Sequence, residues 1–477
     1  MGAFNKWAVI LAITGTSSIT AGDTSCPLTS TNATGRLETY CTGAGRMDGA
    51  NEFFRPLGSN GRSCASCHSP AQGWSIAADE LRSRFEASKG QNPIFRPVDG
   101  ANCNQNVDLS NLRGRRTAYS LLVQSGLIRV ALPVPANAEF EVLSVNNLYG
   151  CDSREELSLY RRPLPVTNLR ALTEVMWDGR GSSVWRGTQP ISSATNPADL
   201  IKDLTQQVRE AGRLHLQMRH RLSAKQEESI VDFEMGLATA QTFDFQAGVL
   251  NADGARGGPL ALAKQILPAF VVGINDPHAG DPHSIKPEDA IRLYDAWSSL
   301  PYGRVYNQIL PAADAQSKRR DSIARGQVLF DQKPFNITNV PGLNDKQQLP
   351  SITGACGTCH DSPNVGNHSV GAFFKIGIDD SDSSLEVAYL PVITLRNRHT
   401  HETIVTTDPG LGLITGLWTD VGKIKVPTLR GLAARAPYFH NGAARSLADV
   451  VGFYDKRFHI HFSPQEKEDL IAFLSVL

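Results

Sequence analysis

The 477-residue sequence lacks any excess of charge, because lysine plus arginine and aspartate plus glutamate each total 47. It also lacks long runs of one sign, so no bulk field would attract nucleic acid or an anionic membrane. Beyond the N-terminus, no apolar run approaches the ~20 residues that a membrane span needs. The sequence therefore predicts no nucleic-acid partner and no membrane span in the mature chain, and it leaves the oligomeric state open.

The N-terminus has the pattern of an export signal. Lys6 supplies positive charge, residues 7–13 form a short apolar core, and residues 17–21 are small enough for cleavage. We expect a signal peptide over residues 1–22, and hence a periplasmic protein. The alternative reading is an uncleaved anchor.

Cysteine is scarce, with eight residues in the chain. Four of them form two motifs, and the other four are Cys26, Cys41, Cys103 and Cys151. An even number in an exported chain predicts two disulfides, with three connectivities open. Free structural thiols are the alternative.

Two pentapeptides of the form CxxCH lie far apart in the chain. They are Cys64-Ala65-Ser66-Cys67-His68 and Cys356-Gly357-Thr358-Cys359-His360. On a helical turn, side chains at i and i+3 share a face, so both sulfurs can reach the two vinyl groups of one porphyrin. The following histidine is then held beneath the iron. The motifs predict two covalently attached c-type haems with His68 and His360 as iron ligands, and a redox CxxC or half of a zinc site is the alternative.

Helical patterns dominate the rest of the chain. Residues 49–54 and 325–330 precede the two motifs in similar fashion, and each predicts a helix beside its haem. Residues 225–243 carry apolar side chains at helical spacing. A last helix begins at a capping box formed by Ser463 and Glu466. Strand-like alternation is sparse, so the predicted fold class is mainly α.

The 27 prolines and 41 glycines imply long loops, such as residues 251–259 and 273–287. With one motif in each half, we expect two c-type cytochrome domains with one covalent haem each. The predicted boundaries are 23–260 for an N-terminal domain and 261–477 for a C-terminal domain.

Three further segments resemble a known family, the bacterial dihaem cytochrome c peroxidases and their MauG-type relatives. The segments, at residues 176–180, 426–430 and 436–442, read Met-Trp-Asp-Gly-Arg, Val-Pro-Thr-Leu-Arg and Ala-Pro-Tyr-Phe-His-Asn-Gly. With both CxxCH motifs they cover most of the chain from residue 45 onward. The resemblance implies a peroxidatic N-terminal haem and an electron-relay C-terminal haem, with Trp177 between them as the catalytic relay residue. Taken alone, Trp177 would be a core residue.

The resemblance also concerns the second ligand of the relay haem. The five methionines are Met1, Met47, Met176, Met218 and Met235, so the C-terminal half offers none. MauG-type relatives use a tyrosine, and the corresponding residue here is Tyr454. A capping box at Ser446 and Asp449 starts a helix whose apolar spacing puts Tyr454 on its buried face. The alternative is a packed core tyrosine beside a five-coordinate or histidine-ligated iron.

The peroxidatic pocket departs from the family pattern. The common peroxidases have a displaceable histidine between the first CxxCH and the WDGR segment, whereas no histidine lies between His68 and His215 here. The family's distal glutamine and glutamate are not matched in place either. We therefore expect Gln207 with His215 or Glu210 to act at the pocket, where histidine would move the proton during peroxide cleavage. The alternative for His215 is a polar surface residue.

Weaker expectations concern other groups. The family's interdomain calcium site corresponds to Thr117, Arg435 and Pro437, and because an arginine there would supply positive charge, calcium is in doubt. The resemblance implies that His440 supports the relay haem without binding iron. His368 is an alternative ligand, although a surface histidine explains it as well.

The sequence as a whole predicts a haem-dependent oxidoreductase of the cytochrome-c peroxidase type and the MauG-like branch. It would reduce hydrogen peroxide with electrons from a small periplasmic donor, either a cytochrome c or a cupredoxin. One alternative is a MauG-like oxidase that acts on a protein or an organic molecule. The other is a dihaem electron carrier without catalytic activity.

Overall fold

A computed structural model describes residues 24–42, 46–105, 107–182, 197–264, 291–298, 314–360, 362, 365–366 and 372–477. The predicted signal peptide, the loop at 273–287 and His368 lie outside these residues. Within them, no helix is both long enough and apolar enough to cross a membrane.

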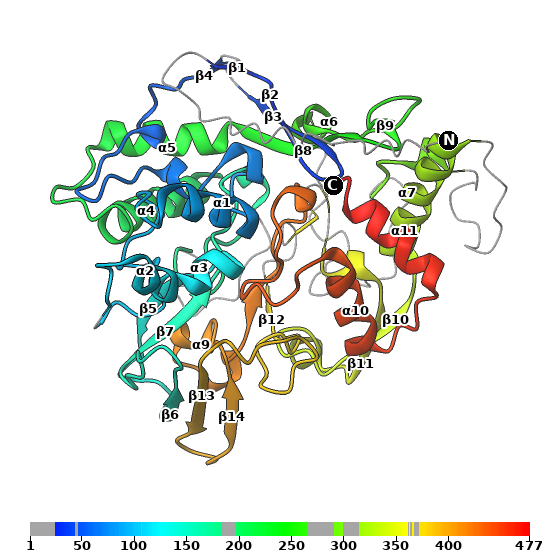
Figure 1. The fold of residues 1–477 in the computed structure, drawn as a ribbon. Helices are drawn as coiled ribbons and strands as arrows, with labels where there is room; N and C mark the ends of the chain where they lie inside the picture. Colours follow the sequence, from blue (N-terminus) through cyan, green and yellow to red (C-terminus); the bar gives the residue numbers. More distant parts are fainter. Residues whose placement is uncertain are drawn as a thin grey trace, which may run out of the picture.

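Two groups of helices lie on opposite sides of the molecule (Figure 1). The first group comes from the N-terminal half: α1 (Ala78–Ser88), α2 (Leu112–Ala118), α3 (Ser120–Ser125), α4 (Pro197–Leu214) and α5 (Ala224–Met235). The second comes mainly from the C-terminal half: α7 (Ala315–Gln332), α8 (Asn344–Gln347), α10 (Leu447–Phe458) and α11 (Pro464–Leu474). Two short helices complete the set, α6 (Pro259–Lys264) and α9 (Gly412–Thr415). Each half therefore contributes its own helical shell.

Antiparallel strands form a second layer of organisation. A four-stranded sheet has the order β2 (Leu28–Thr31), β3 (Gly35–Cys41), β8 (Leu237–Asp244) and β9 (Gly248–Val249). A three-stranded sheet has the order β14 (Thr403–Thr406), β13 (Val392–Asn397) and β6 (Phe140–Asn146). The remaining pairs are β1 (Thr24–Ser25) with β4 (Arg46–Met47), β5 (Ile128–Pro133) with β7 (Glu156–Arg161), β10 (Phe335–Thr338) with β11 (Ser351–Gly354), and β12 (Phe373–Phe374) with β15 (Ile424–Lys425).

The fold is therefore mixed, and the prediction of a mainly α protein is correct only in part. Strand β3 alternates buried and less buried side chains along its whole length, and β13 does the same. This period of two is the pattern of a strand with one face against a core. Each alternating run is short and interrupted by polar residues, so the longer helical patterns dominate the sequence.

Several helix predictions can be compared with the structure. The helix predicted over 225–243 ends at Met235, and strand β8 begins at Leu237. Residues 325–330 lie inside α7 as expected, whereas the segment 49–54 contains only one 3-10 turn, at Glu52–Phe54.

Both predicted capping boxes are present. Ser446 caps α10 by accepting from the Asp449 amide, and Ser463 caps α11 by accepting from the Glu466 amide. Each serine satisfies an amide that the helix itself leaves unpaired, which fixes where the helix starts.

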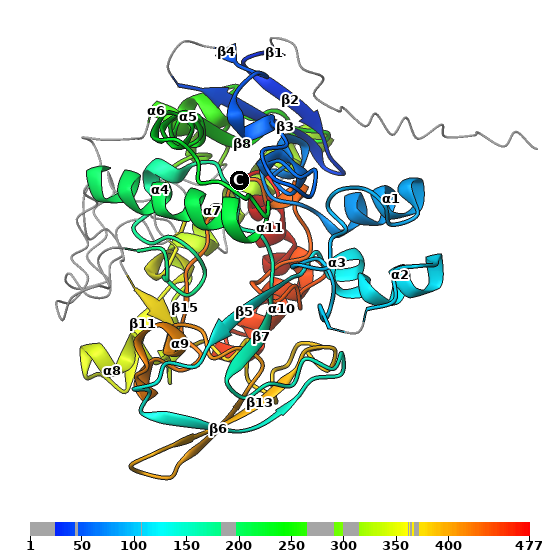
Figure 2. The same ribbon diagram turned by 90° about the vertical axis from the view of Figure 1, so that its left-hand side faces the viewer.

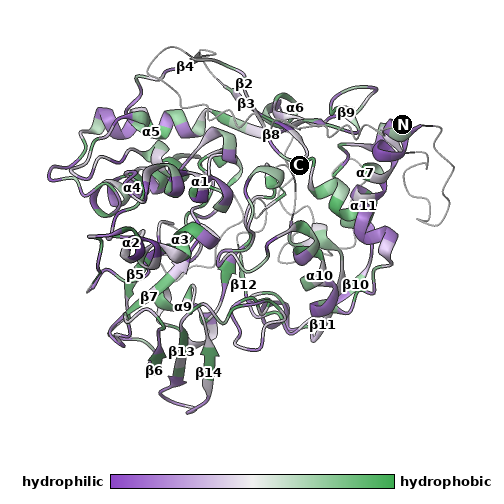
Figure 3. Cartoon of the chain, in the orientation of Figure 1, coloured by the Kyte–Doolittle hydropathy of each residue, from purple (hydrophilic) through white to green (hydrophobic). Residues whose placement is uncertain are grey.

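The halves are not separate in space. Strand β6 of the N-terminal half pairs with β13 of the C-terminal half from Asn146–Val392 to Phe140–Asn397. The 90° view shows this sheet below both groups of helices (Figure 2). Between the groups, β12 is coloured as a hydrophobic segment (Figure 3), consistent with an apolar contact region.

Covalent and packing contacts hold the helical shells in place. Two disulfides, Cys26–Cys41 and Cys103–Cys151, confirm the predicted pair and select one of the three connectivities. Helices α7 and α11 meet at Gly326, where an added Cβ would lie 1.9 Å from the carbonyl oxygen of Asp469. Because glycine carries no side chain, the two helices can approach closely at this point. Together they close the wall behind the second CxxCH motif.

Candidate haem cavities

Both CxxCH motifs are wound into the same tight turn. The amides of Cys67 and His68 donate to the carbonyl of Cys64, each at 3.1 Å. In the second motif, the amides of Cys359 and His360 donate to Cys356 at 3.2 and 3.0 Å. All four motif cysteines are outside disulfides. Each turn therefore presents two cysteines that are outside disulfides, together with a histidine.

The two motif histidines are oriented in the same way. Nδ1 of His68 lies 3.0 Å from the carbonyl oxygen of Trp74, and Nδ1 of His360 lies 3.2 Å from that of Val365. Because a carbonyl can only accept, Nδ1 carries the proton and Nε2 keeps its lone pair, which is the arrangement of a metal-ligating histidine. Burial lowers the pKa of His68 to about 4, so its imidazole is neutral near pH 7.

Trp74 and Val365, whose carbonyls accept from the two motif histidines, share a further feature. Their φ angles are 59° and 57°, in the left-handed region that L residues rarely adopt. In each half this backbone turn directs a carbonyl back at the histidine ring. The two halves therefore orient the motif histidine by the same backbone geometry.

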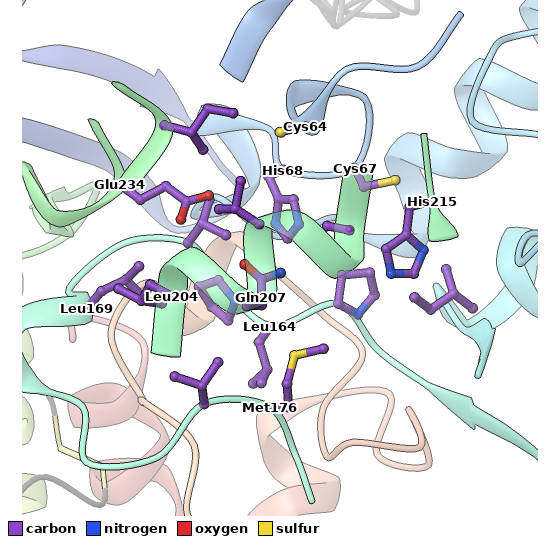
Figure 4. Close-up of a pocket in the computed structure, with 18 of the residues that line it drawn as sticks. Cys64, Cys67, His68, Leu164, Leu169, Met176, Leu204, Gln207, His215 and Glu234 are labelled. Atoms are coloured by element: carbon purple, nitrogen blue, oxygen red, sulfur yellow. The ribbon is translucent and has the colours of Figure 1, made fainter. Parts of the chain in front are cut away.

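A cavity opens beside each motif, and the two are nearly equal in size. The first contains 1480 Å³ of atom-free space and the second 1490 Å³, in both cases including the part open to solvent. Apolar side chains line most of the first wall, among them Leu164, Leu169, Met176 and Leu204 (Figure 4). The second is lined by residues such as Phe330, Phe374, Val451 and Leu470.

Buried cations stand in the wall between the cavities. Arg162 lines both cavities, and its guanidinium donates to the backbone carbonyls of Ser125, Ile76 and Arg435. Burial lowers its pKa to about 9 and that of Lys425, which also lines both cavities and has Glu174 beside it, to about 8. Burying a cation is costly, and an anionic group bound beside Arg162 would offset that cost.

These features fit a c-type haem at each site. Paired thiols match two vinyl groups, a neutral imidazole nitrogen matches the iron, apolar walls match the macrocycle, and the cations match its carboxylates. Cys64, Cys67 and His68 would hold the first group, and Cys356, Cys359 and His360 would hold the second.

Trp177 lies in the wall that the cavities share, because its side chain lines both. Its indole Nε1–H donates to the carbonyl of Arg162 at 2.7 Å, and its own carbonyl accepts from the Lys425 amide at 3.0 Å. The ring is buried, with 8% exposure. The sequence prediction that Trp177 lies between two sites agrees with this placement, although its role stays a prediction.

Helix α4 supplies polar groups to the first cavity. Leu204, Gln207 and Ala211 lie on the face of α4 that lines the cavity, as the helical period of 3.6 residues requires, and His215, the residue directly after α4, lines it as well. Glu210 does not line it, and its Oε1 accepts from Gln206 at 3.1 Å. Of the three predicted distal residues, the structure therefore places Gln207 and His215 at the cavity and turns Glu210 away.

His215 belongs to a chain of charged contacts. Its Nδ1 lies 2.6 Å from Oδ2 of Asp99, whose Oδ1 accepts from Arg62 at 2.6 Å. Asp99 and Arg62 are buried, at 5% and 2% exposure. The His215 and Arg62 contacts hold the pKa of Asp99 below its usual range despite burial. Sequence reasoning missed Asp99 and Arg62 because neither lies near His215 in the chain.

Glu234 is a second residue that sequence reasoning missed. It extends from α5 into the first cavity (Figure 4), is 3% exposed, and its Oε2 has no hydrogen-bond partner in the described structure. Burial raises its pKa to about 8. The side chain is therefore neutral near pH 7. Its place in the predicted helix of 225–243, on the face with Ile230, was the available signal.

The second cavity has a different polar lining. Tyr454 lines it from α10, and its ring stacks on Phe458 at 6.2 Å between ring centroids. Burial raises the pKa of its phenol. The prediction that Tyr454 faces inward on the helix agrees with this position, and iron ligation by its oxygen stays a prediction.

His440 also lines the second cavity and packs edge-on against Trp177, with 5.8 Å between ring centroids. Its Nε2 lies 2.6 Å from Oδ1 of Asp379. Nearby, Arg161 binds Asp408 through two nitrogens, at 2.6 and 2.8 Å, and also contacts Asp178. His440 thus joins a buried charge network beside Trp177, and its supporting role at the second haem stays a prediction.

Two of the three residues aligned with a calcium site form hydrogen bonds within the protein. Arg435 is buried in the wall of the second cavity and donates to the carbonyls of Arg430 and Thr428. The Thr117 carbonyl accepts from Asn102 at 3.2 Å. No cluster of three or more His, Cys, Asp or Glu side chains suited to a metal occurs among the described residues. The structure adds nothing in favour of calcium.

Known proteins give an independent comparison. The chain is 28% identical over 173 residues to the cytochrome-c peroxidase IdrP1 of Pseudomonas sp. (strain SCT), which is 32% of this chain and 44% of that protein. It is 32% identical over 144 residues to the cytochrome-c peroxidase IdrP2 of Denitromonas iodatirespirans, which is 28% of this chain and 38% of that protein. This chain is a distant relative of cytochrome-c peroxidases.

The relationship confirms the family resemblance but covers less than half of each peroxidase. No protein-family model matches the chain. A solved MauG-like protein associated with microbial copper homeostasis is 15% identical over 89% of this chain and 87% of its own, at a TM-score of 0.36. That value is too low to establish a common fold. For this peroxidase relative, the activity, the donor and the site roles are therefore matters for proposal.

Proposed function

We propose that this protein is an exported dihaem c-type peroxidase that reduces hydrogen peroxide with electrons from a small redox protein of the periplasm, a cytochrome c or a cupredoxin. The observation that carries the proposal is Trp177, which lines both CxxCH cavities. Distant homology to cytochrome-c peroxidases supports the same reading. An indole in a shared wall suits electron transfer from the second cavity to the first.

Bound haem iron would supply the peroxide chemistry and the one-electron chemistry. The protein's own part is to hold, orient and protonate. His68 and His360 present lone pairs fixed by backbone carbonyls, and the cysteines tether each group. Gln207 and His215 line the first cavity, where a histidine can take a proton from one oxygen of peroxide and return it to the other. The proposal therefore assigns peroxide to the first cavity and electron entry to the second.

A second candidate is a MauG-like oxidase that acts on a protein or an organic molecule. The observation in its favour is Tyr454, which lines the second cavity in a half of the chain without methionine. A phenolate ligand would favour oxidised iron and lower the reduction potential relative to methionine.

Spectra and turnover test these proposals. Mass spectrometry of the exported protein should show two added porphyrins that resist acid-acetone extraction. The resting protein should contain a high-spin haem that reacts with peroxide, and reduced cytochrome c or cupredoxin should be oxidised in steady state. Peroxide reactivity without donor turnover would favour the oxidase. Two low-spin, peroxide-inert haems would instead identify an electron carrier and refute both enzymes.

A further inference from the structure

We propose that Asp99 is a positioning residue that makes His215 a proton acceptor facing the first cavity. This inference rests on the proposed peroxidase function, because it concerns the residue that moves the proton of peroxide. It adds two residues, Asp99 and its partner Arg62, that lie outside the family motifs. It also selects His215 over the other polar groups at the cavity.

The contact between His215 and Asp99 fixes which ring nitrogen carries the proton. An ionised carboxylate can only accept, so the 2.6 Å contact requires Nδ1 of His215 to donate to Oδ2 of Asp99. Nε2 then keeps its lone pair. Since the side chain lines the cavity, this nitrogen is the basic atom available there. A base oriented by a third group is the arrangement used by activated catalytic histidines.

Arg62 keeps Asp99 ionised and immobile. Its guanidinium donates to Asp99 at 2.6 Å, to the Pro93 carbonyl at 2.9 Å, to the Ile94 carbonyl at 2.5 Å and to the His215 carbonyl at 3.2 Å. These contacts satisfy the fork of donors in a buried setting. The arginine therefore fixes both the carboxylate and the backbone of the histidine that the carboxylate orients.

Other polar groups of the same cavity are less suited to accept a proton. The amide of Gln207 is not basic. Among the described residues none forms an ion pair with buried Glu234, so Glu234 is neutral and would donate. His215 is also 31% exposed at its side chain, which connects it to bulk water. Of Gln207, Glu234 and His215, only His215 combines an oriented base with a route for proton exchange.

The proton balance is complete. Reduction of one hydrogen peroxide to two waters consumes two electrons, from the donor protein, and two protons, from solvent. When the O–O bond breaks, the proton that His215 takes from one oxygen is delivered to the other, which leaves as the first water. The remaining oxygen atom takes up the two electrons and the two solvent protons and becomes the second water. His215 thus returns to its starting state after the step, and Asp99 keeps the same ring nitrogen available each time.

Asp99→Asn is the primary test. An asparagine side chain can turn its amide toward Nδ1 and donate to it, which would select the other tautomer and remove the base. We expect the reaction of the holoprotein with peroxide to slow about 10- to 100-fold, the usual cost of losing the partner that orients a functional imidazole. Cyanide association should slow similarly, because hydrogen cyanide must also lose a proton as it binds.

A double-mutant cycle distinguishes positioning from a general structural role. His215→Gln should slow both reactions by about 10²–10⁴. The Asp99→Asn, His215→Gln double variant should be no slower than His215→Gln, because the carboxylate acts only through the histidine. Asp244→Asn is the matched control, since Asp244 is a buried aspartate paired with Arg319 at 2.9 Å that lines neither cavity. Its rates should equal those of the wild type.

Each outcome of these measurements either supports or contradicts the positioning role of Asp99. If folded Asp99→Asn keeps wild-type rates, or if it slows His215→Gln further by the same factor, the inference is wrong. If wild-type protein does not react with peroxide, the proposed function fails, while cyanide association still decides the role of Asp99. If Asp99→Asn alone does not fold, Arg62→Gln combined with Asp99→Asn removes both buried charges and provides the same comparison.

Discussion

The two cavities share one construction on the proximal side and differ on the opposite side. Each has a CxxCH turn, a histidine oriented by a carbonyl from a residue with positive φ, and an apolar wall. The first adds Gln207, Glu234 and a partly exposed His215, whereas the second adds Tyr454 and a buried His440. Repetition therefore provides two attachment sites, and the lining side chains make them chemically different.

The two histidine–aspartate pairs show this difference most clearly. His215 pairs with Asp99 at a side-chain exposure of 31%, whereas His440 pairs with Asp379 at 1%. Both contacts are 2.6 Å. The first pair can exchange protons with water, and the second is sealed beside Trp177. This difference in exposure fits the proposed roles, in which protons are exchanged at the first cavity.

Replacing either motif histidine with alanine should have the largest effect on activity. His68→Ala should abolish the reaction with peroxide, because no ligand would hold iron in the first cavity. His360→Ala should leave a single peroxide reaction intact and abolish steady-state turnover with the donor. Stopped-flow absorbance and turnover assays measure the two quantities. The reverse pattern would exchange the roles assigned to the cavities.

Trp177→Phe should impair electron transfer between the two cavities while both keep their haems. Losing the indole N–H leaves the buried Arg162 carbonyl unpaired, so the free energy of unfolding should fall by about 1–3 kcal/mol. Donor-dependent turnover should fall, while cyanide binding at the first haem should not change.

Trp297→Phe is the matched control for that experiment. Trp297 has the same 8% exposure, and its Nε1 donates to the Ala252 carbonyl at 3.0 Å. It lines neither cavity. It should lose similar stability and keep full turnover, and equal turnover in both variants would argue against a relay through Trp177.

Tyr454→Phe tests whether the phenol of Tyr454 binds iron in the second cavity. If the phenol binds iron, the spectrum and reduction potential of the second haem should shift and those of the first should not. Tyr438→Phe is the control, because Tyr438 lines the same cavity and donates to the Leu432 carbonyl at 3.0 Å. An unchanged second-haem spectrum in Tyr454→Phe would remove this residue from the ligand set.

Glu234→Gln should change mainly the pH dependence of stability. The folded-state pKa of Glu234 is raised from 4.5 to about 8, so the folded state retains a proton that the unfolded state loses in this range. Stability from this group is full below about pH 4.5 and is lost as pH rises toward 8.

Relative to wild type, Glu234→Gln should gain about 1–3 kcal/mol between pH 5 and pH 8, because the amide does not ionise. Denaturant midpoints at the two pH values measure the difference. A constant difference between the two proteins across this range would show that Glu234 titrates normally.

Local signals were enough for part of this structure. The capping boxes at Ser446 and Ser463 place two helix starts because each depends on contacts within four residues. The CxxCH turns are equally local. Short-range patterns of this kind can be read from one sequence because the partners are neighbours in the chain.

Long-range contacts set the limit of prediction. Asp99 and His215 are 116 positions apart, and nothing near either residue indicates the other. Glu210 and His215 both looked suitable, and only the rotation of α4 against the cavity separates them. The pairing of β6 with β13 joins the two halves of the chain, so no local pattern indicates it.

That pairing across the halves has a consequence for how the protein is made. Glu141 of β6 contacts Arg396 of β13 at a separation of 255 positions, so this sheet is complete only when most of the chain has emerged. The wall around Trp177 also needs the backbone of Lys425. If the chain is exported as proposed, the first CxxCH motif would cross the membrane before its pocket is closed, and its two thiols would then be accessible for haem attachment.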